Sequence, residues 1–161
     1  MPQYHVRRDD RELTAPAELA HILESGRFAT IAMCQDGEPY LVTLSYGYDA
    51  EQRAMFFHVA PEGRKLDALA SDPHVCATVI LDLGYEPGRC KHNYRSVVLT
   101  GTMSLVTDLD EARAGMRVLV GHLEDDPQAV WEQNRLDDDA TFDRMRVARL
   151  DIDEMTGKAG S

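Results

Sequence analysis

The stretch Phe57-His58-Val59-Ala60-Pro61-Glu62-Gly63-Arg64-Lys65 joins a predicted strand to a predicted helix. The apolar run at 54–59 indicates the strand, and the helix is expected at 63–70, after a turn. Arg64 and Lys65 lie in the first turn of that helix, although a helix N-terminus carries a partial positive charge and favours acids. Two cations there suit a bound phosphate, because they reinforce a site that already favours anions. Alternatively, both side chains point into solvent, since pairs of cations are common on helices.

His58 ends the predicted strand just before this turn, on the face that it shares with Ala54 and Phe56. A lone histidine in such a place is more often structural than functional. Its position beside the predicted phosphate turn nevertheless makes it a candidate for the site.

The composition is that of an ordinary globular domain. The chain has 161 residues, 43% of them hydrophobic and 28% charged, which suits one compact domain. The tail from about Glu154 is Gly-rich, and we expect it to be partly mobile, at its end. There is neither an apolar run of about 20 residues nor an apolar signal-peptide core, so we expect a cytoplasmic protein without membrane contacts. The net charge of −11 argues against a nucleic-acid partner, because phosphate backbones bind basic surfaces.

The three cysteines indicate neither a disulfide framework nor a metal centre. Their odd number and wide spacing provide no CxxC pair, and Cys34 and Cys76 fall in apolar runs, where we expect small core residues. Cys90 and His92 flank one lysine, but two ligands without partners do not make a metal site. We therefore predict no bound metal.

The segment from Tyr40 to Tyr48 alternates with the period of a strand. One face carries Tyr40, Val42, Leu44, Tyr46 and Tyr48, and the other carries Leu41, Thr43, Ser45 and Gly47. The second face is small and partly polar. It is either exposed to solvent or shaped so that a flat ligand can approach the backbone, as glycine inside a strand indicates.

The remaining pattern predicts a mainly β (α+β) protein. A helix is expected at 15–25 with Thr14 as its N-cap, further strands at 28–34, 75–81, 94–106 and 145–152, a loop at 83–93, and helices after Thr107 and from Pro127. Gly101 interrupts the longest strand and indicates a bulge. About six closely spaced strands with few helices are typical of an antiparallel barrel.

Several motifs together resemble one family. They are Arg7-Arg8-Asp9-Asp10-Arg11-Glu12, Pro39-Tyr40-Leu41-Val42-Thr43-Leu44-Ser45-Tyr46-Gly47-Tyr48, the run Phe57-His58 through Gly63-Arg64-Lys65, Tyr94-Arg95-Ser96-Val97-Val98 with Gly101, and Met155-Thr156-Gly157-Lys158. In this order they resemble the pyridoxamine 5′-phosphate oxidase-like split barrels that bind FMN, and among these the nitroimidazole-resistance (Nim) type reductases.

The resemblance implies a six-stranded antiparallel split barrel that forms a homodimer with two FMN sites at its interface. It assigns the FMN phosphate to Arg64 and Lys65. It implies that further flavin contacts come from Thr43, Leu44, Ser45, Tyr46, His58, Val59, Ala60 and Ser96. His58 matches a histidine that faces the active site in the Nim-type proteins, so it is the predicted catalytic residue.

The predicted function is an FMN-dependent reductase acting on a small electron-poor compound, such as a nitro-aromatic. The oxidase group's C-terminal substrate motif, with its Arg and Trp, is not evident, so oxidation of pyridoxamine phosphate is not expected. Two alternatives stay open. One is a flavin- or haem-binding protein without turnover, with His58, His74 or His92 as an axial haem ligand. The other is a deazaflavin-dependent reductase using the same basic turn.

Overall fold

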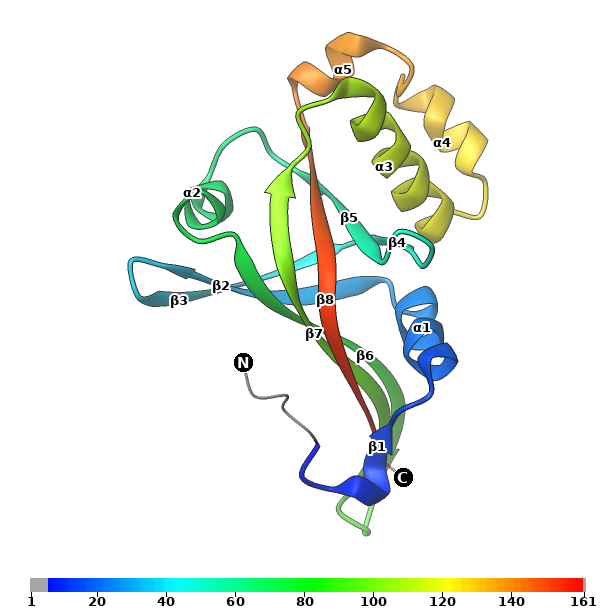
Figure 1. Ribbon diagram of the computed structural model, residues 1–161. Helices are drawn as coiled ribbons and strands as arrows, with labels where there is room; N and C mark the ends of the chain where they lie inside the picture. Colours follow the sequence, from blue (N-terminus) through cyan, green and yellow to red (C-terminus); the bar gives the residue numbers. More distant parts are fainter. Residues whose placement is uncertain (1–5, 161) are drawn as a thin grey trace.

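The computed structural model describes residues 6–160, which form one antiparallel sheet with helices around it (Figure 1). The sheet order is β3-β2-β6-β7-β8-β5-β4, and β1 pairs with β8. The strands are β1 (Glu12–Leu13), β2 (Phe28–Gln35), β3 (Glu38–Ser45), β4 (Gly47–Asp49), β5 (Ala54–Val59), β6 (His74–Glu86), β7 (Lys91–Leu105) and β8 (Arg146–Gly160). The helices are a 3-10 turn (Asp9–Arg11), α1 (Pro16–Ser25), α2 (Arg64–Ser71), α3 (Leu109–Leu123), α4 (Pro127–Gln133) and α5 (Asp139–Asp143).

A single residue between β3 and β4 makes the sheet curl into a split barrel. These two strands lie at opposite edges of the sheet, yet only Tyr46 separates them in the chain. The edges must therefore approach each other at Tyr46. The predicted strand 40–48 is thus two strands, which is one reason why the sheet has eight strands rather than the predicted six.

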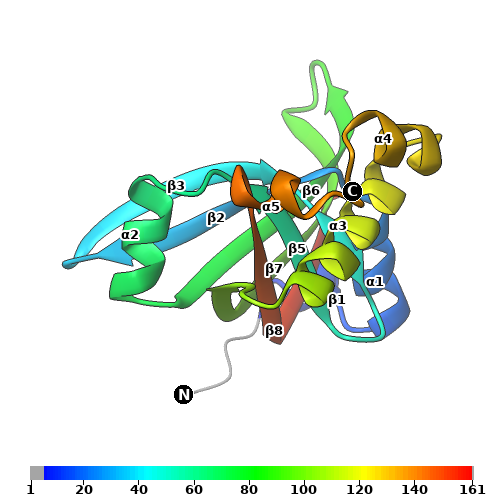
Figure 2. The same ribbon diagram turned by 90° about the horizontal axis from the view of Figure 1, so that it is seen from above.

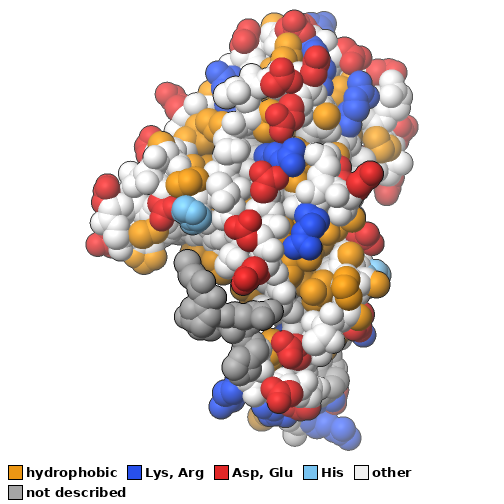
Figure 3. Space-filling view, in the orientation of Figure 1, with side chains coloured by type: hydrophobic (Ala, Val, Ile, Leu, Met, Phe, Trp, Pro, Cys, Tyr) orange, Lys and Arg blue, Asp and Glu red, His pale blue; other side chains and the backbone are white. Residues whose placement is uncertain are grey.

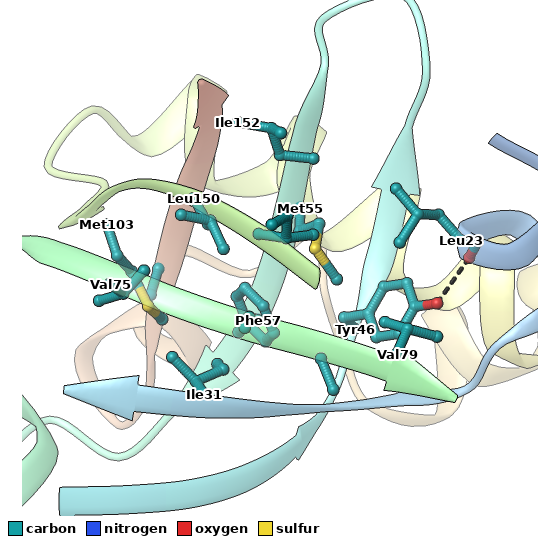
Figure 4. Packing of buried hydrophobic residues seen from close by; sticks show 14 of the residues in the cluster. Leu23, Ile31, Tyr46, Met55, Phe57, Val75, Val79, Met103, Leu150 and Ile152 are labelled. Atoms are coloured by element: carbon teal, nitrogen blue, oxygen red, sulfur yellow. Dashed lines mark hydrogen bonds between the residues drawn. The ribbon is translucent and has the colours of Figure 1, made fainter. Parts of the chain in front are cut away.

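The barrel interior is the larger of two apolar cores. Alternate residues of the strands fill it, among them Ile31, Phe57, Val79 and Leu150 (Figure 4). The Tyr46 side chain is fully buried there, and its hydroxyl donates a hydrogen bond of 2.6 Å to the Leu23 carbonyl oxygen of α1. Burial raises the pKa of the Tyr46 hydroxyl, so this group stays protonated and keeps its role as a donor.

A second core lies between the barrel and the helical segment that joins β7 to β8. Helices α3, α4 and α5 gather at one end of the molecule (Figures 1 and 2). Phe56 on β5 and Val147 on β8 pack against Met116 and Leu119 of α3, with Trp131 of α4 in the same cluster. Strand β5 is therefore buried on both faces along most of its length. None of the helices in residues 6–160 is both long and apolar enough to span a membrane.

Two segments that were predicted as irregular are regular strands. The predicted loop 83–93 is mostly the continuation of β6 and β7, whose turn contains Gly88 (φ 81°) and Cys90 (φ 49°). In the tail from Glu154, which was expected to be partly mobile, residues 154–160 continue β8 and pair with β7, as far as Tyr94 opposite Gly160. Both segments are strands because their backbones pair with neighbouring strands, which the local sequence does not reveal.

Gly101 and Gly47 lie in strands for different structural reasons. The predicted bulge at Gly101 is confirmed, because the β7–β8 register shifts between Thr100 and Gly101. At Gly47 the close neighbour is a helix backbone, since an added Cβ would lie 2.4 Å from the Leu119 Cα of α3. The small residue that had indicated an approaching flat ligand is therefore required by helix packing.

Two smaller expectations were also wrong. Ala15 occupies the N-cap position of α1, without a side-chain hydrogen bond, and Pro16 opens the helix. Cys76 is exposed on the outer face of β6 rather than buried, and Cys34 is half-buried. Side chains alternate between the two faces along β2 and β6. Cys34 and Cys76 lie on the outward faces, whereas residues on the inward faces, among them Ile31 and Ala77, fill the barrel.

Candidate functional site

The start of α2 has the properties of an anion site. Gly63 occupies the N-cap position with φ 129°, a conformation that residues with a side chain rarely adopt. No side chain caps this helix end, so the backbone N–H groups of Arg64 and Lys65 have no capping oxygen, whereas the Leu66 N–H donates to the Gly63 carbonyl oxygen. The Arg64 guanidinium stacks on the ring of Tyr40 in β3, with 4.5 Å between its central carbon and the ring centroid.

Arg64 and Lys65 have no acidic partner at ion-pair distance in the described part of the chain. Some other arginines pair with acids, as Arg95 does with Glu18 at 3.5 Å and Arg149 with Asp151 at 2.8 Å, whereas others, such as Arg53, form no ion pair there. Within residues 6–160, neither Arg64 nor Lys65 forms an ion pair, although the chain carries a net charge of −11. Arg64 is exposed and Lys65 is half-buried. Together with the uncapped helix end, they form a local positive site on an acidic protein.

The predicted residues of β3 divide between its two faces. Thr43 and Ser45 are exposed on the outer face, where the Thr43 hydroxyl lies 2.9 Å from that of Thr30 on β2. Leu44 is half-buried on the barrel side, and Tyr46 is fully buried. Tyr40, which Arg64 contacts, lies on the same barrel-side face as Leu44, so the Arg64 contact and the Thr43 and Ser45 hydroxyls lie on opposite faces of β3. A ligand on the outer face could reach the side chains of Thr43 and Ser45, but only the backbones of Leu44 and Tyr46.

The register places Ser96 on the same outer face as Thr43. Thr43 lies opposite Thr30, Thr30 opposite Thr78, and Thr78 opposite Val98, two residues from Ser96. Ser96 also lines a hollow of about 370 Å³ on β6 and β7, together with Ile80, Asp82, His92 and Tyr94. This hollow is mainly apolar, and one acid–histidine pair lies in it.

His58 lies elsewhere. On β5 its neighbours Phe57 and Val59 are buried in the barrel, and Phe56 is buried against α3. His58 shares the α3-facing side with Phe56 but is exposed, and it lines a separate cavity with residues of α3, α4 and α5. Ala60, just after the strand, is exposed. Within one chain, the structure therefore brings Arg64 to β3 and leaves His58 on the helical side of β5.

The other two candidate histidines each contact an aspartate. His74 Nδ1 lies 2.8 Å from Asp72 Oδ1, and His92 Nε2 lies 2.8 Å from Asp82 Oδ1. The hydrogen bond from His92, followed by one from the Gly84 N–H, holds the pKa of the Asp82 carboxyl below its usual range. Both histidines are exposed. No group of three metal-ligating side chains occurs in the described part of the chain.

Sequence patterns did not predict the contact of Tyr40 with Arg64 or that of Asp82 with His92. Tyr40 and Arg64 are 24 positions apart in the sequence, and they meet because α2 packs on β2, the strand beside β3. Asp82 and His92 face each other because the predicted loop is a paired hairpin. No local signal in the sequence reveals either contact.

The profile of the pyridoxamine 5′-phosphate oxidase family matches residues 15–159. The chain belongs to this family. The comparison with curated proteins found no match.

Solved structures share the fold of this family member at low identity. A candidate 5-nitroimidazole antibiotic resistance protein from Bacteroides thetaiotaomicron is 20% identical over 98% of this chain and 96% of its own, with a TM-score of 0.79. The flavocytochrome Anf3 from Azotobacter vinelandii is 23% identical over 100% of this chain and 75% of its own, with a TM-score of 0.81. An FAD- and haem-binding protein from Mycobacterium smegmatis is 20% identical over 94% of this chain and 74% of its own, with a TM-score of 0.77.

Proposed function

We propose that this protein is an FMN-dependent reductase that acts on a small electron-poor compound, such as a nitro-aromatic. The observation that carries the proposal is the pair of cations, Arg64 and Lys65, at the start of α2, where no side chain caps the helix and neither cation has an ion-pair partner in residues 6–160. In an acidic protein, such a pair suits the terminal phosphate of FMN. The family match and the names of the flavin-binding and nitroimidazole-resistance neighbours support it.

The residues present fit this cofactor. Arg64 and Lys65 would hold the phosphate, and stacking on Tyr40 holds the Arg64 guanidinium in place. Thr43 and Ser45 offer hydroxyls along the outer face of β3, and Ser96 offers another on β7. When bound, FMN supplies the electron transfer, while the chain binds, orients and shields it.

The outer face of the sheet also suits a second subunit. Leu41, Ile80 and Val98 expose 64, 58 and 44% of their surface on strands β3, β6 and β7. Exposed apolar residues on one sheet face are typical of a protein–protein interface. A homodimer formed here would cover this face and the flavin ring. Light scattering should give twice the chain mass, and Ile80→Asp should shift the protein toward monomer; a wild-type monomer at micromolar concentration contradicts the dimer.

The cofactor assignment is tested by titration with FMN and riboflavin. Replacing Arg64 and Lys65 together by Ala removes two charge-assisted contacts, each worth about 1.5–3 kcal/mol. FMN affinity should fall about a hundredfold or more, whereas riboflavin affinity should change little. A matched control removes two exposed arginines of the helical end, by Arg135→Ala and Arg144→Ala, and should leave both affinities unchanged. An equal loss for both ligands would show that the α2 cations do not recognise phosphate.

His58 is proposed to act at the substrate, because an imidazole can hold or release a proton near neutral pH. His58→Ala should keep the fold and most FMN affinity but lose reductase turnover. Normal turnover would make His58 a bystander, and failure to fold would make it a structural residue.

A second candidate is haem binding without turnover. The observation in its favour is that His74 and His92 each have an aspartate at hydrogen-bond distance, an arrangement that orients metal-binding histidines. The absorbance spectrum of the purified protein separates the two: flavin gives a yellow protein and haem a red one. A deazaflavin reductase would bind a deazaflavin phosphate, but not FMN, at the same two cations.

A further inference from the structure

Residues 124–145, which contain α4 and α5, are held to the rest of the protein by side chains. They lie against α3 at one end of the molecule (Figures 1 and 2). The Glu124 N–H donates to the Val120 carbonyl oxygen where α3 ends, and no other backbone hydrogen bond joins these residues to the remainder of 6–160. Helices α4 and α5 have seven and five residues. Helices this short are unstable alone, so packing against α3 has to hold them in place.

Two arginines of α3 bind the acidic run at 137–139. Arg113 and Arg117 are four positions apart and therefore lie on one side of the helix. Arg113 pairs with the Asp139 carboxylate, and it donates a hydrogen bond of 3.1 Å to the Asp137 carbonyl oxygen. The Arg117 guanidinium lies 3.7 Å from the Asp137 carboxylate.

The same two arginines stack on aromatic rings of residues 124–145. The central carbon of Arg117 lies 4.0 Å from the Trp131 ring centroid, and that of Arg113 lies 5.6 Å from the Phe142 ring centroid. The Trp131 indole N–H donates a hydrogen bond of 2.9 Å to the Asp137 carboxylate, so the ring and the acid that Arg117 contacts are also joined to each other. We call Arg113 and Arg117, with these partners, the arginine clasp.

The charge of residues 124–145 opposes the closed arrangement. Eight acids and two arginines give them a net charge of −6, more than half of the −11 of the whole chain. Acidic side chains are spread over this end of the molecule (Figure 3). Like charges repel one another in a compact segment, which favours a form in which they lie farther apart. The arginine clasp offsets this repulsion from the α3 side.

Closure covers an apolar interior. The buried side chains of Trp131, Leu136 and Phe142 pack in one cluster with the apolar face of α3. Beside this cluster is the cavity of about 270 Å³ described above, which is lined on one side by α3 and on the other by Val130, Asn134, Leu136, Thr141 and Met145. If residues 124–145 move away, that wall is lost, and Met116 and Leu119 of α3, now 6 and 7% exposed, become accessible.

We propose that residues 124–145 are a lid that opens and closes as one unit while the barrel stays folded, that the arginine clasp holds the lid shut, and that its opening gives access to the interior beside α3. A segment whose backbone hydrogen bonds are internal, and which is attached by side chains, is the kind of unit that opens locally. This inference does not rest on the proposed function, because it concerns the protein without a cofactor.

Hydrogen exchange followed by mass spectrometry tests whether the lid opens as a unit. Under native conditions, the backbone amides of residues 130–144 should exchange about a hundredfold or more faster than those of β7 and β8. In the double variant Arg113→Gln, Arg117→Gln, the lid amides should exchange about tenfold or more faster than in wild type, since two stacked ion pairs are lost. Exchange in β7 and β8 should not change.

A matched control removes the same charge without touching the clasp. Arg135 and Arg144 are exposed, lie within the lid, and form no ion pair among residues 6–160. The double variant Arg135→Gln, Arg144→Gln should change exchange of the lid amides less than about threefold, because exposed charges contribute little.

Thiol labelling tests whether opening gives access to the interior. Met116 lines the cavity under the lid, whereas Met55 is fully buried in the barrel core. Each is replaced by cysteine in turn, and labelling with iodoacetamide is followed by the mass of the peptide concerned, which separates it from the three native cysteines. Loss of the clasp should speed labelling of Met116→Cys about tenfold or more and leave that of Met55→Cys unchanged.

Each arm has a result that would overturn its part of the proposal. Wild-type lid amides that exchange as slowly as those of β7 and β8 would mean that the lid opens only when the whole protein unfolds. Equal acceleration by the control pair would mean that net charge, not the clasp, holds the lid. Unchanged labelling of Met116→Cys beside faster lid exchange would mean that opening gives no access. The wild-type exchange result stands even if a variant does not fold.

Discussion

Gly47→Ala tests the contact on which the helical end depends. The added Cβ would lie 2.4 Å from the Leu119 Cα and 2.5 Å from the Leu119 backbone nitrogen. Ordinary van der Waals contact begins near 3.4 Å, so α3 or β4 must move by about 1 Å. Both partners are backbone atoms, and no side chain can rotate away. Overpacking of this kind costs about 1–3 kcal/mol, which lowers Tm by about 2–12 °C in a domain of this size.

The assay is thermal unfolding followed by circular dichroism, with Gly121→Ala as a matched control. Gly121 lies on α3, the helix whose backbone Gly47 contacts, and an added Cβ at Gly121 meets nothing within 4 Å. Alanine should stabilise that position by about 0.5–1 kcal/mol, because glycine loses more backbone freedom on folding. The two Gly→Ala changes should therefore have opposite signs. A Gly47→Ala protein as stable as wild type would refute the close approach of α3 to β4.

Three further predictions follow from single contacts. Tyr46→Phe leaves the buried Leu23 carbonyl without its donor, and urea unfolding should show a loss of about 1–3 kcal/mol; no loss would mean that water replaces the hydroxyl. The depressed pKa of Asp82 means that its stabilising contact with His92 is present above the usual Asp pKa of about 3.9 and is lost as pH falls through the lower folded value. Wild type should therefore lose more stability than Asp82→Asn between pH 6 and pH 2, and identical pH profiles would contradict this. Although Cys76 is exposed, the surrounding strands partly desolvate its sulfur and raise the pKa of the thiol, so alkylation at pH 7 should be slow. It should quicken if the proposed dimer is opened by Ile80→Asp, and an unchanged rate would count against that interface.

Local patterns in the sequence determined most of the elements. The apolar run at 54–59, the alternation at 40–45, the apolar spacing after Thr107 and the bulge at Gly101 each depend on neighbours within a few positions, and the structure confirms them. The cation pair at the start of α2 was likewise visible, because charge and helix position are local properties. The faces of β3 were predicted for the same reason, since side chains alternate along any strand.

Long-range pairing decided the rest. Residues 154–160 contain two glycines and no strong strand signal, yet they form a strand because β7 offers them a hydrogen-bonding edge. The break at Tyr46 arises where the two sheet edges meet, and Gly47 is needed because α3 packs there. The sequence placed His58 next to Arg64, only six positions away, but the strand alternation and the helical end direct its side chain into a different cavity. Which groups share a site depends on how the sheet closes, and that information is spread over the whole chain.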